Sequence, residues 1–180
     1  MSMFTGYPLS RGSIHITGTE CTDKPTFATG FLTDAQGIDI KKHVWAYKKQ
    51  REIFRRMNTY RGEFAELHPP FSSTSDAALI RIDAPLADVR DIVYTPEDDM
   101  IIEDWIRSHI ETTWHSLGTC KMGPREEAGV VDASLSVYGV QGVKIADLSV
   151  PPLNVAANTM STAVAVAEKA ADIFIRELGL

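Results

Sequence analysis

Residues 146–161 read ADLSVPPLNVAANTMS, a loop that leads directly into the last expected helix of the chain. That helix should run from about Thr159 to Leu178, and alanine and valine occupy most of its sides. A helix that is apolar on all sides is normally buried within a larger protein. The stretch therefore predicts a C-terminal helix whose apolar faces need more packing surface than these 180 residues provide.

The start of this helix also has the chemistry of a ligand site. Amides in the first turn of a helix have no intrahelical partner and lie at the positive end of the helix dipole. They suit a ligand that develops negative charge, as a reduced flavin does around its pyrimidine ring. Helix capping is the simpler interpretation of Asn158 and Ser161. For Asp147, near the start of the loop, the simpler interpretation is a hydrogen bond within its own turn.

A second segment with candidate catalytic residues, 111–125, reads ETTWHSLGTCKMGPR. It places His115 beside a tryptophan in a turn rich in glycine and threonine. A lone histidine is more often structural than catalytic. Cys120 follows five residues later, but nothing in the pattern marks it as the activated nucleophile of a hydrolase. If the two loops meet, His115 and Asn158 could both reach one substrate hydroxyl.

The remaining elements are expected from local patterns. Residues 11–17 alternate as a half-buried strand does, and shorter strands are expected at 78–82 and 143–145. Thr95 and Pro96 open a helix that ends near His109. Asp39 is expected to cap an earlier helix, whose apolar stripe is Ile40, Val44, Tyr47, Phe54 and Met57. Its other faces should be solvated and contain Lys41, Lys42, Lys48, Lys49, Arg51, Arg55 and Arg56.

Composition excludes several classes of protein. The net charge of −6 argues against an extended nucleic-acid surface. Two cysteines, Cys21 and Cys120, are too few for a disulfide framework and match no zinc pattern. A reducing compartment is therefore expected, with a single disulfide between the two cysteines as the alternative. No signal peptide, membrane span or peroxisomal tripeptide is recognised, so an intracellular, soluble, cytoplasmic protein is the default expectation.

Taken together, the motifs resemble the glucose–methanol–choline (GMC) oxidoreductase family, with fungal alcohol (methanol) oxidases the nearest likeness. The resemblance covers nearly the whole chain and is weakest between Leu67 and Pro96, where relatives have a longer insertion. The matching stretches are YPLSRGSIHIT at 7–17, VWAYKK at 44–49, ETTWHSLGTC at 111–120, GPRE at 123–126, VYGVQGVK at 137–144, DLSV at 147–150 and NT at 158–159.

The resemblance implies specific roles for residues of both loops. A histidine at the position of His115 acts as the base on the substrate hydroxyl, and Asn158 hydrogen-bonds the same oxygen. The turn at Asp147 and Leu148 and the amides of Thr159 and Met160 correspond to positions that contact FAD. The implied reaction is oxidation of a primary alcohol to an aldehyde by hydride transfer to the flavin, with oxygen as the expected acceptor. No metal site is implied. The resemblance also allows a peroxisomal location, although no targeting signal for it is seen.

The family binds FAD mainly through an N-terminal βαβ unit with a G-x-G-x-x-G turn, and these 180 residues contain no such pattern. The resemblance therefore implies the C-terminal part of a flavoenzyme, with a small alcohol and the missing FAD-binding half as partners. We expect an α+β fold with an antiparallel sheet and packed helices. Residues 1–113 should belong to the substrate-binding part, and 114–180 should return to the FAD domain.

Two further expectations follow for the isolated chain. Without the FAD-binding half it should be inactive and tend to self-associate, since apolar surface would be exposed. The alternative is a folded remnant that serves as a non-catalytic binding or scaffold fragment without flavin. The colour of the purified protein distinguishes the two, because a bound flavin is yellow.

Overall fold

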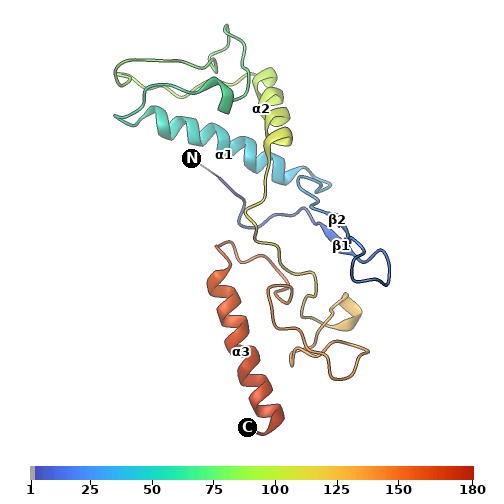
Figure 1. Cartoon of the computed structure of the whole chain (residues 1–180). Coiled ribbons are helices and arrows are strands. Elements are labelled where there is room, and N and C mark those ends of the chain that lie inside the picture. The colour runs from blue at the N-terminus through green and yellow to red at the C-terminus, as the bar shows by residue number, and fades with distance from the viewer. Residues whose placement is uncertain (1–2) are drawn as a thin grey trace. The chain divides into compact units, whose positions relative to one another are not determined.

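The computed structural model describes residues 3–180, which divide into two compact units (Figure 1). The first unit combines the residues up to Thr5 with residues 31–111, and the second combines residues 6–30 with residues 112–180. In the described part, helices dominate and one two-stranded antiparallel sheet is formed. The predicted α+β class is therefore confirmed, whereas the predicted division at residue 113 into substrate and FAD parts stays a prediction.

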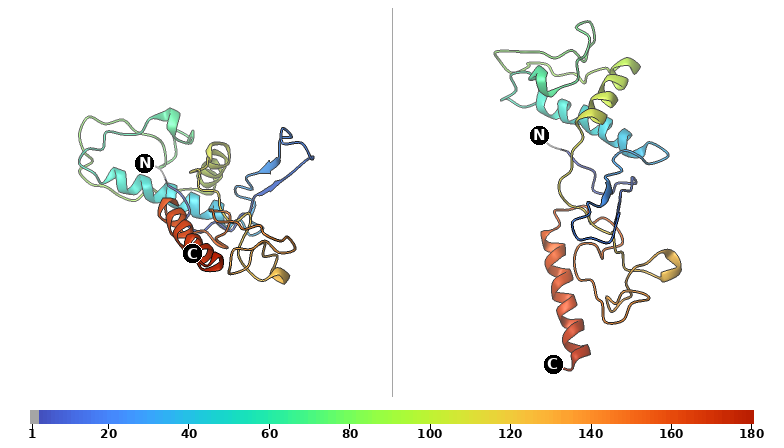
Figure 2. Two further views of the ribbon diagram at one scale, coloured as in Figure 1. Left: turned by 60° about the horizontal axis from the view of Figure 1, so that its bottom comes forward. Right: turned by 45° about the vertical axis from the view of Figure 1, so that its right-hand side comes forward.

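The first unit is built on two helices, α1 (Ile38–Arg55) and α2 (Pro96–His109), which lie side by side in both views of Figure 2. A 3-10 turn, η1, spans Ala65–Leu67 between them. The helices bury a small apolar core that consists of Ile40, Tyr47, Ile102 and Ile106. Phe71 and Tyr94 pack against this core from the connecting loop. The predicted stripe of α1 faces inward at Ile40, Val44 and Tyr47, whereas Met57 lies beyond the end of the helix and is exposed.

The start of α1 differs from the predicted one. Asp39 is buried in the first turn rather than placed at the N-cap, which is Gly37 in the left-handed conformation with φ of 60°. The side chain of Asp34 accepts the backbone N–H groups of Ile38 and Asp39 instead. The prediction of Asp39 as the cap was therefore wrong, because a carboxylate in the preceding loop reaches the free amides.

The start of α2 is confirmed. The Thr95 hydroxyl accepts the N–H of Asp98 at 3.1 Å, and the Asp98 carboxylate accepts the N–H of Thr95 at 2.9 Å. Ser75, from the connecting loop, donates its hydroxyl to the same carboxylate. Burial alone would raise the pKa of Asp98, but these hydrogen bonds outweigh it and lower the pKa.

One predicted surface residue of α1 lies in the interior. Arg51 is buried and its guanidinium contacts Glu63, the carbonyl of Ala77 and the Tyr94 hydroxyl. The other predicted basic residues of this face are exposed or half-buried, whereas the loop after α1 covers the helix at Arg51. That loop forms a single bridge between Gly62 and Arg81 and no strand at 78–82, so this strand prediction was wrong.

The second unit contains the short strands β1 (Ser13–His15) and β2 (Thr26–Ala28), a 3-10 turn η2 (Arg125–Glu127) and the long helix α3 (Met160–Leu178). Ile14 of β1 pairs with Phe27 of β2. The strand prediction at 11–17 is confirmed in its centre, but the expected burial is not, because Ile14 and Ile16 are both exposed.

Irregular segments, not strands, build the core of the second unit. Val131, Leu135, Val150 and Ala170 are buried together, with Ala170 contributed by α3. Residues 143–145 form only one isolated bridge, between Ser136 and Lys144, so the strand expected there was wrong. The helix expected at 159–178 is confirmed. Among the described residues, no helix is long and apolar enough to cross a membrane.

Candidate active site

The loops that contain His115 and Asn158 meet within the second unit. The His115 Nε2 atom lies 2.7 Å from the Asn158 Oδ1 atom, although 43 positions separate the two residues in the sequence. The ring of His115 is half-buried and the Asn158 side chain is exposed. A general base must lie within hydrogen-bond reach of the proton that it removes. The two side chains thus place a base and an amide together where a small hydroxyl group could contact both.

A series of backbone hydrogen bonds brings the two loops together. Gly118 N–H donates to the Leu148 carbonyl at 3.0 Å, Cys120 N–H to the Ser149 carbonyl at 2.9 Å and Met122 N–H to the Val150 carbonyl at 2.8 Å. Gly118 has φ of 79°, and a Cβ atom there would lie 3.2 Å from the Pro151 carbonyl oxygen. A side chain at this position would be strained by its backbone conformation.

The residue before the histidine has an unusual backbone conformation. Trp114 has φ of 55°, which is uncommon for a bulky residue, and its N–H donates to the Thr112 hydroxyl at 2.9 Å. Its side chain is 84% exposed, so packing of the indole does not explain this conformation. Residues held in sparsely populated conformations are concentrated at functional sites. The strain beside His115 therefore supports a functional rather than a purely structural histidine.

The turn at Asp147 and Leu148, which was predicted to contact the flavin, is closed by hydrogen bonds within the chain. Asp147 Oδ1 accepts hydrogen bonds from the hydroxyl and the N–H of Ser149. Both bonds lower the pKa of the Asp147 carboxyl, and the bond from the hydroxyl contributes most. The Leu148 carbonyl is occupied by the Gly118 N–H. The Asp147 carboxylate therefore bonds within its own turn, and a flavin contact at this loop would fall to the remaining backbone groups.

The first turn of α3 suits the electron-rich end of a flavin ring. Thr159 is the N-cap residue, its side chain does not cap the helix and no acidic residue lies in the first turn. The amides of the first turn thus keep the free donors of an uncapped helix start. Met160 is exposed beside them. Residues 147–161 contain no glycine, so they lack the glycine-rich turn that brings a pyrophosphate close to a helix start, and the free amides suit the ring system of a flavin better than its pyrophosphate.

Sequence reasoning missed one side chain of this cluster. It assigned only the backbone amide of Thr159 to the flavin, whereas the Thr159 hydroxyl lies 3.2 Å from the His115 Nδ1 atom. The sequence offered one signal, a threonine at an N-cap position whose side chain needs a partner. Among the described residues, the hydrogen bonds of the His115 ring go to Asn158 and Thr159 and not to Cys120. This arrangement argues against a thiol hydrolase.

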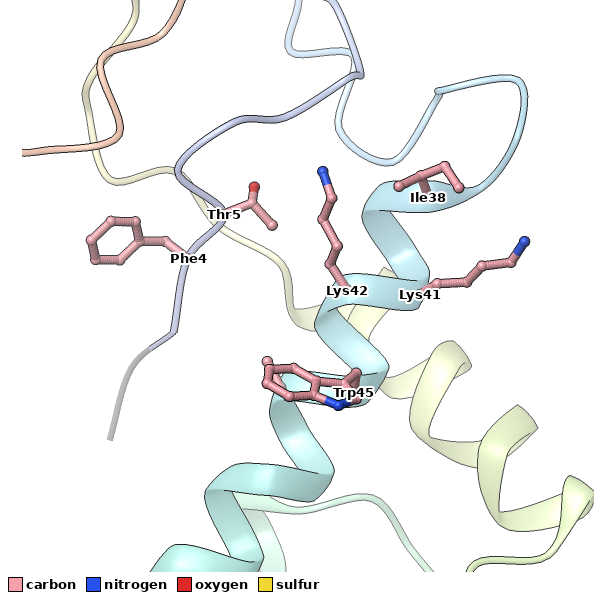
Figure 3. A pocket seen from close by; sticks show the side chains of 7 residues that line it. Phe4, Thr5, Ile38, Lys41, Lys42 and Trp45 are labelled. Carbon is pink, nitrogen blue, oxygen red and sulfur yellow. The ribbon is translucent and has the colours of Figure 1, made fainter.

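The first unit contains a groove of about 450 Å³ that holds none of the predicted site residues. Figure 3 shows Trp45 lying across α1 beside Lys41 and Lys42, with Phe4 and Thr5 on the facing segment. Its lining includes no histidine or carboxylate that could serve as an acid or base. In the part of the chain that the structure describes, no group of histidine, cysteine, aspartate and glutamate residues could hold a metal ion.

Comparisons with known proteins identify the relatives of this chain. Residues 8–167 match the C-terminal family model of GMC oxidoreductase. The chain is 41% identical to an alcohol oxidase of Pichia angusta over 99% of its own length and 33% of that protein. It is 32% identical to an alcohol dehydrogenase [acceptor] of Pseudomonas putida over 96% of the chain and 27% of that protein. The chain thus spans about a third of the curated relatives that it matches.

Solved structures show the same relationship. An FAD-dependent oxidoreductase from Chaetomium thermophilum superimposes with a TM-score of 0.75 at 31% identity, covering 97% of this chain and 26% of that one. A fungal aryl-alcohol oxidase gives a TM-score of 0.67 at 26% identity, covering 97% and 25%. On the match of residues 8–167, the chain belongs to the GMC oxidoreductase family, whose members are FAD-dependent, and comprises its C-terminal region.

Proposed function

We propose that this chain provides the substrate-side catalytic residues of an FAD-dependent enzyme that oxidises primary alcohols to aldehydes. The observation that carries the proposal is the 2.7 Å contact between His115 Nε2 and Asn158 Oδ1. It joins the two loops at the start of α3, where the uncapped amides suit a flavin ring. The relatives named alcohol oxidase and alcohol dehydrogenase support an alcohol as the substrate.

In this proposal His115 takes the hydroxyl proton of the alcohol at Nε2. Asn158 contributes a hydrogen bond to the same oxygen and so orients the carbinol carbon. The backbone at Asp147 and Leu148 and the amides of Thr159 and Met160 contact the cofactor. FAD, when bound, supplies the hydride acceptor, and oxygen is the expected final oxidant. The FAD-binding half of such an enzyme is the partner that the site requires.

Replacement of His115 tests this function directly. In the flavin-loaded enzyme, formed by co-expressing the chain with an FAD-binding half, His115→Ala should lower turnover of a primary alcohol by ~10²–10⁴-fold, the usual share of a general base. Flavin absorbance per protein should stay unchanged, since His115 is not proposed to hold the cofactor. Peroxide formation and absorbance at the flavin maximum measure the two effects.

The matched control is His15→Ala, which removes an exposed histidine from β1 of the same unit. It should leave both turnover and flavin content as they are. Equal turnover in the His115→Ala and His15→Ala enzymes would reduce His115 to a structural residue and contradict the proposal.

A further inference from the structure

The two N-cap threonines of this chain use their side chains differently. Thr95 accepts the N–H of Asp98 and closes the capping box of α2. Thr159 occupies the equivalent position before α3, yet its side chain makes no capping hydrogen bond. Losing an N-cap hydrogen bond normally destabilises a helix. The Thr159 hydroxyl therefore has a different use that outweighs capping.

That use is a contact with the histidine. Thr159 is only 5% exposed, and its Oγ1 atom lies 3.2 Å from His115 Nδ1, at the long end of the hydrogen-bond range. The adjacent residue, Asn158, contacts the other ring nitrogen at 2.7 Å. Two consecutive residues at the start of α3 thus engage both nitrogens of one imidazole. The orientation of the ring is determined by the helix start.

The positions of the protons give this contact a chemical meaning. A ring ready to take a proton at Nε2 carries its own proton on Nδ1, and Nδ1–H then needs an acceptor, which Thr159 Oγ1 provides. When the O–H bond of the alcohol breaks, its electron pair stays on oxygen and the proton forms a new N–H bond at Nε2. After the transfer Nε2–H donates to Asn158 Oδ1, which is the arrangement that the 2.7 Å contact records, while Nδ1–H keeps the same acceptor throughout. Before the transfer, Nε2 and Oδ1 are both acceptors, so the NH2 group of Asn158 must face Nε2 or the substrate hydroxyl must lie between the two atoms.

We infer that Thr159 is a positioning residue for His115, its hydroxyl serving Nδ1 instead of capping α3, so that Nε2 is the nitrogen that exchanges a proton with substrate. This inference rests on the proposed function for its catalytic meaning. The contact itself lies within the second unit of the 180-residue chain and can be measured without cofactor.

Ring nitrogen chemical shifts in the nitrogen-15-labelled chain provide the first test. The five histidines give five ring systems, and loss of one set in His115→Gln identifies His115. Thr159→Val keeps the shape of the side chain but removes the hydroxyl, so the His115 Nδ1 shift should move. Thr159→Ser keeps the hydroxyl and should restore it. Thr162→Val, the matched change within the first turn of α3, should leave it unchanged.

The other four histidine rings are internal controls for the fold and should not move in any of the threonine variants. A His115 Nδ1 shift that is the same in the parent chain and in a folded Thr159→Val chain would overturn the inference. So would a shift that moves in Thr159→Ser as far as in Thr159→Val, because the hydroxyl would then not be the cause.

Activity of the flavin-loaded enzyme provides the second test. Thr159→Val should lower kcat by about tenfold, the share of one hydrogen bond to a ring that becomes charged, with little change in KM. Thr159→Ser should recover most of the loss. If Thr159→Val keeps full kcat while His115→Ala loses activity, the inference is overturned and the proposed function stands. Full kcat in His115→Ala overturns the proposed function, and the catalytic role of Thr159 with it.

Discussion

At the scale of single residues, Arg51 illustrates how a charged side chain can organise a loop. Its Nε and Nη2 atoms donate to Glu63 Oε1 at 3.0 and 2.9 Å, and Nη1 donates to the Ala77 carbonyl at 3.0 Å. The second oxygen of Glu63 accepts the N–H of Ile80 at 3.1 Å. One buried ion pair therefore connects α1 to two separate points of the long loop before α2.

Removing one partner of this pair should strongly destabilise the first unit. Glu63→Gln leaves the Arg51 charge buried without its counter-ion, which typically costs about 3–5 kcal/mol. Glu103→Gln is the control, because Glu103 pairs with Arg107 on the exposed face of α2, where such pairs contribute about 0–1 kcal/mol. Urea denaturation of the three proteins measures the difference. Equal midpoints for the two variants would contradict this account of Arg51.

The sign of the pH dependence follows from the same contacts. Burial alone would raise the pKa of Glu63, but the Ile80 N–H and the Arg51 guanidinium outweigh it and lower the pKa. A carboxyl with a lowered folded-state pKa stabilises the protein above its unfolded value of about 4.3. The stability advantage over Glu63→Gln should therefore persist at neutral pH and disappear as the pH falls through the folded-state pKa.

At the scale of elements, helix starts show which local signals are reliable. Thr95, Pro96 and Asp98 act within four consecutive residues, and α2 begins where they predict. The start of α1 depends instead on Asp34, four positions before Ile38, and on a left-handed Gly37. A reciprocal capping box is visible in the sequence because both partners are near neighbours. A carboxylate that reaches across a turn leaves no comparable pattern.

Loss of the capping box should weaken the first unit measurably. Thr95→Ala should lower the free energy of unfolding by about 1 kcal/mol, within the usual range of about 0.5–2 kcal/mol for N-cap substitutions. Thr59→Ala, in an exposed position after α1, is the control and should have no such effect. The loss is measured as a shift of the urea midpoint of unfolding, provided that the slope of the unfolding free energy against urea concentration stays the same. An undisturbed midpoint in Thr95→Ala would show that α2 is stabilised by packing alone.

At the scale of the whole molecule, apolar side chains are exposed along the C-terminal helix. Along α3, Val164, Ile175 and Leu178 are exposed, and only Ala170 of this helix is fully buried. Apolar surface of this kind marks sites of protein contact or of aggregation. The chain spans about a third of its relatives, so we propose the FAD-binding half of the family as the partner of this surface.

The 180-residue chain alone should not bind FAD tightly or oxidise alcohols. Tight binding needs a pyrophosphate site at a glycine-rich turn and helix start, and residues 147–161 contain no glycine. Titration of FAD at micromolar concentration, followed by flavin fluorescence, should show no stoichiometric complex, and methanol or ethanol should yield no peroxide. Sedimentation should show self-association.

Co-expression with an FAD-binding half should yield a yellow complex and suppress that self-association. Stoichiometric FAD binding by the chain alone would contradict the prediction, since the flavin would then be held without the pyrophosphate site. A colourless complex would favour a non-catalytic scaffold.

The sequence by itself determined the features that depend on near neighbours. The start of α2 follows from its capping box and the extent of α3 from hydropathy, and the loop motifs at 111–120 and 147–161 sufficed to indicate the family. The strands expected at 78–82 and 143–145 are absent from the described structure except for single bridges. A strand requires a paired partner, and no local pattern shows whether one is available.

Only the tertiary structure decided the contacts between distant residues. Arg51 follows Tyr47 by four positions and precedes Phe54 by three, so helical periodicity places it on the inward stripe of α1. Only the tertiary structure shows that Glu63 and Ala77 cover it and supply its hydrogen bonds. His115 meets Asn158 and Thr159 across 43 and 44 positions, through hydrogen bonds between the loops and a left-handed Trp114. The propensity of tryptophan gives no sign of that conformation. The residue types indicated the chemistry, and the closure of the two loops decided which atoms can perform it.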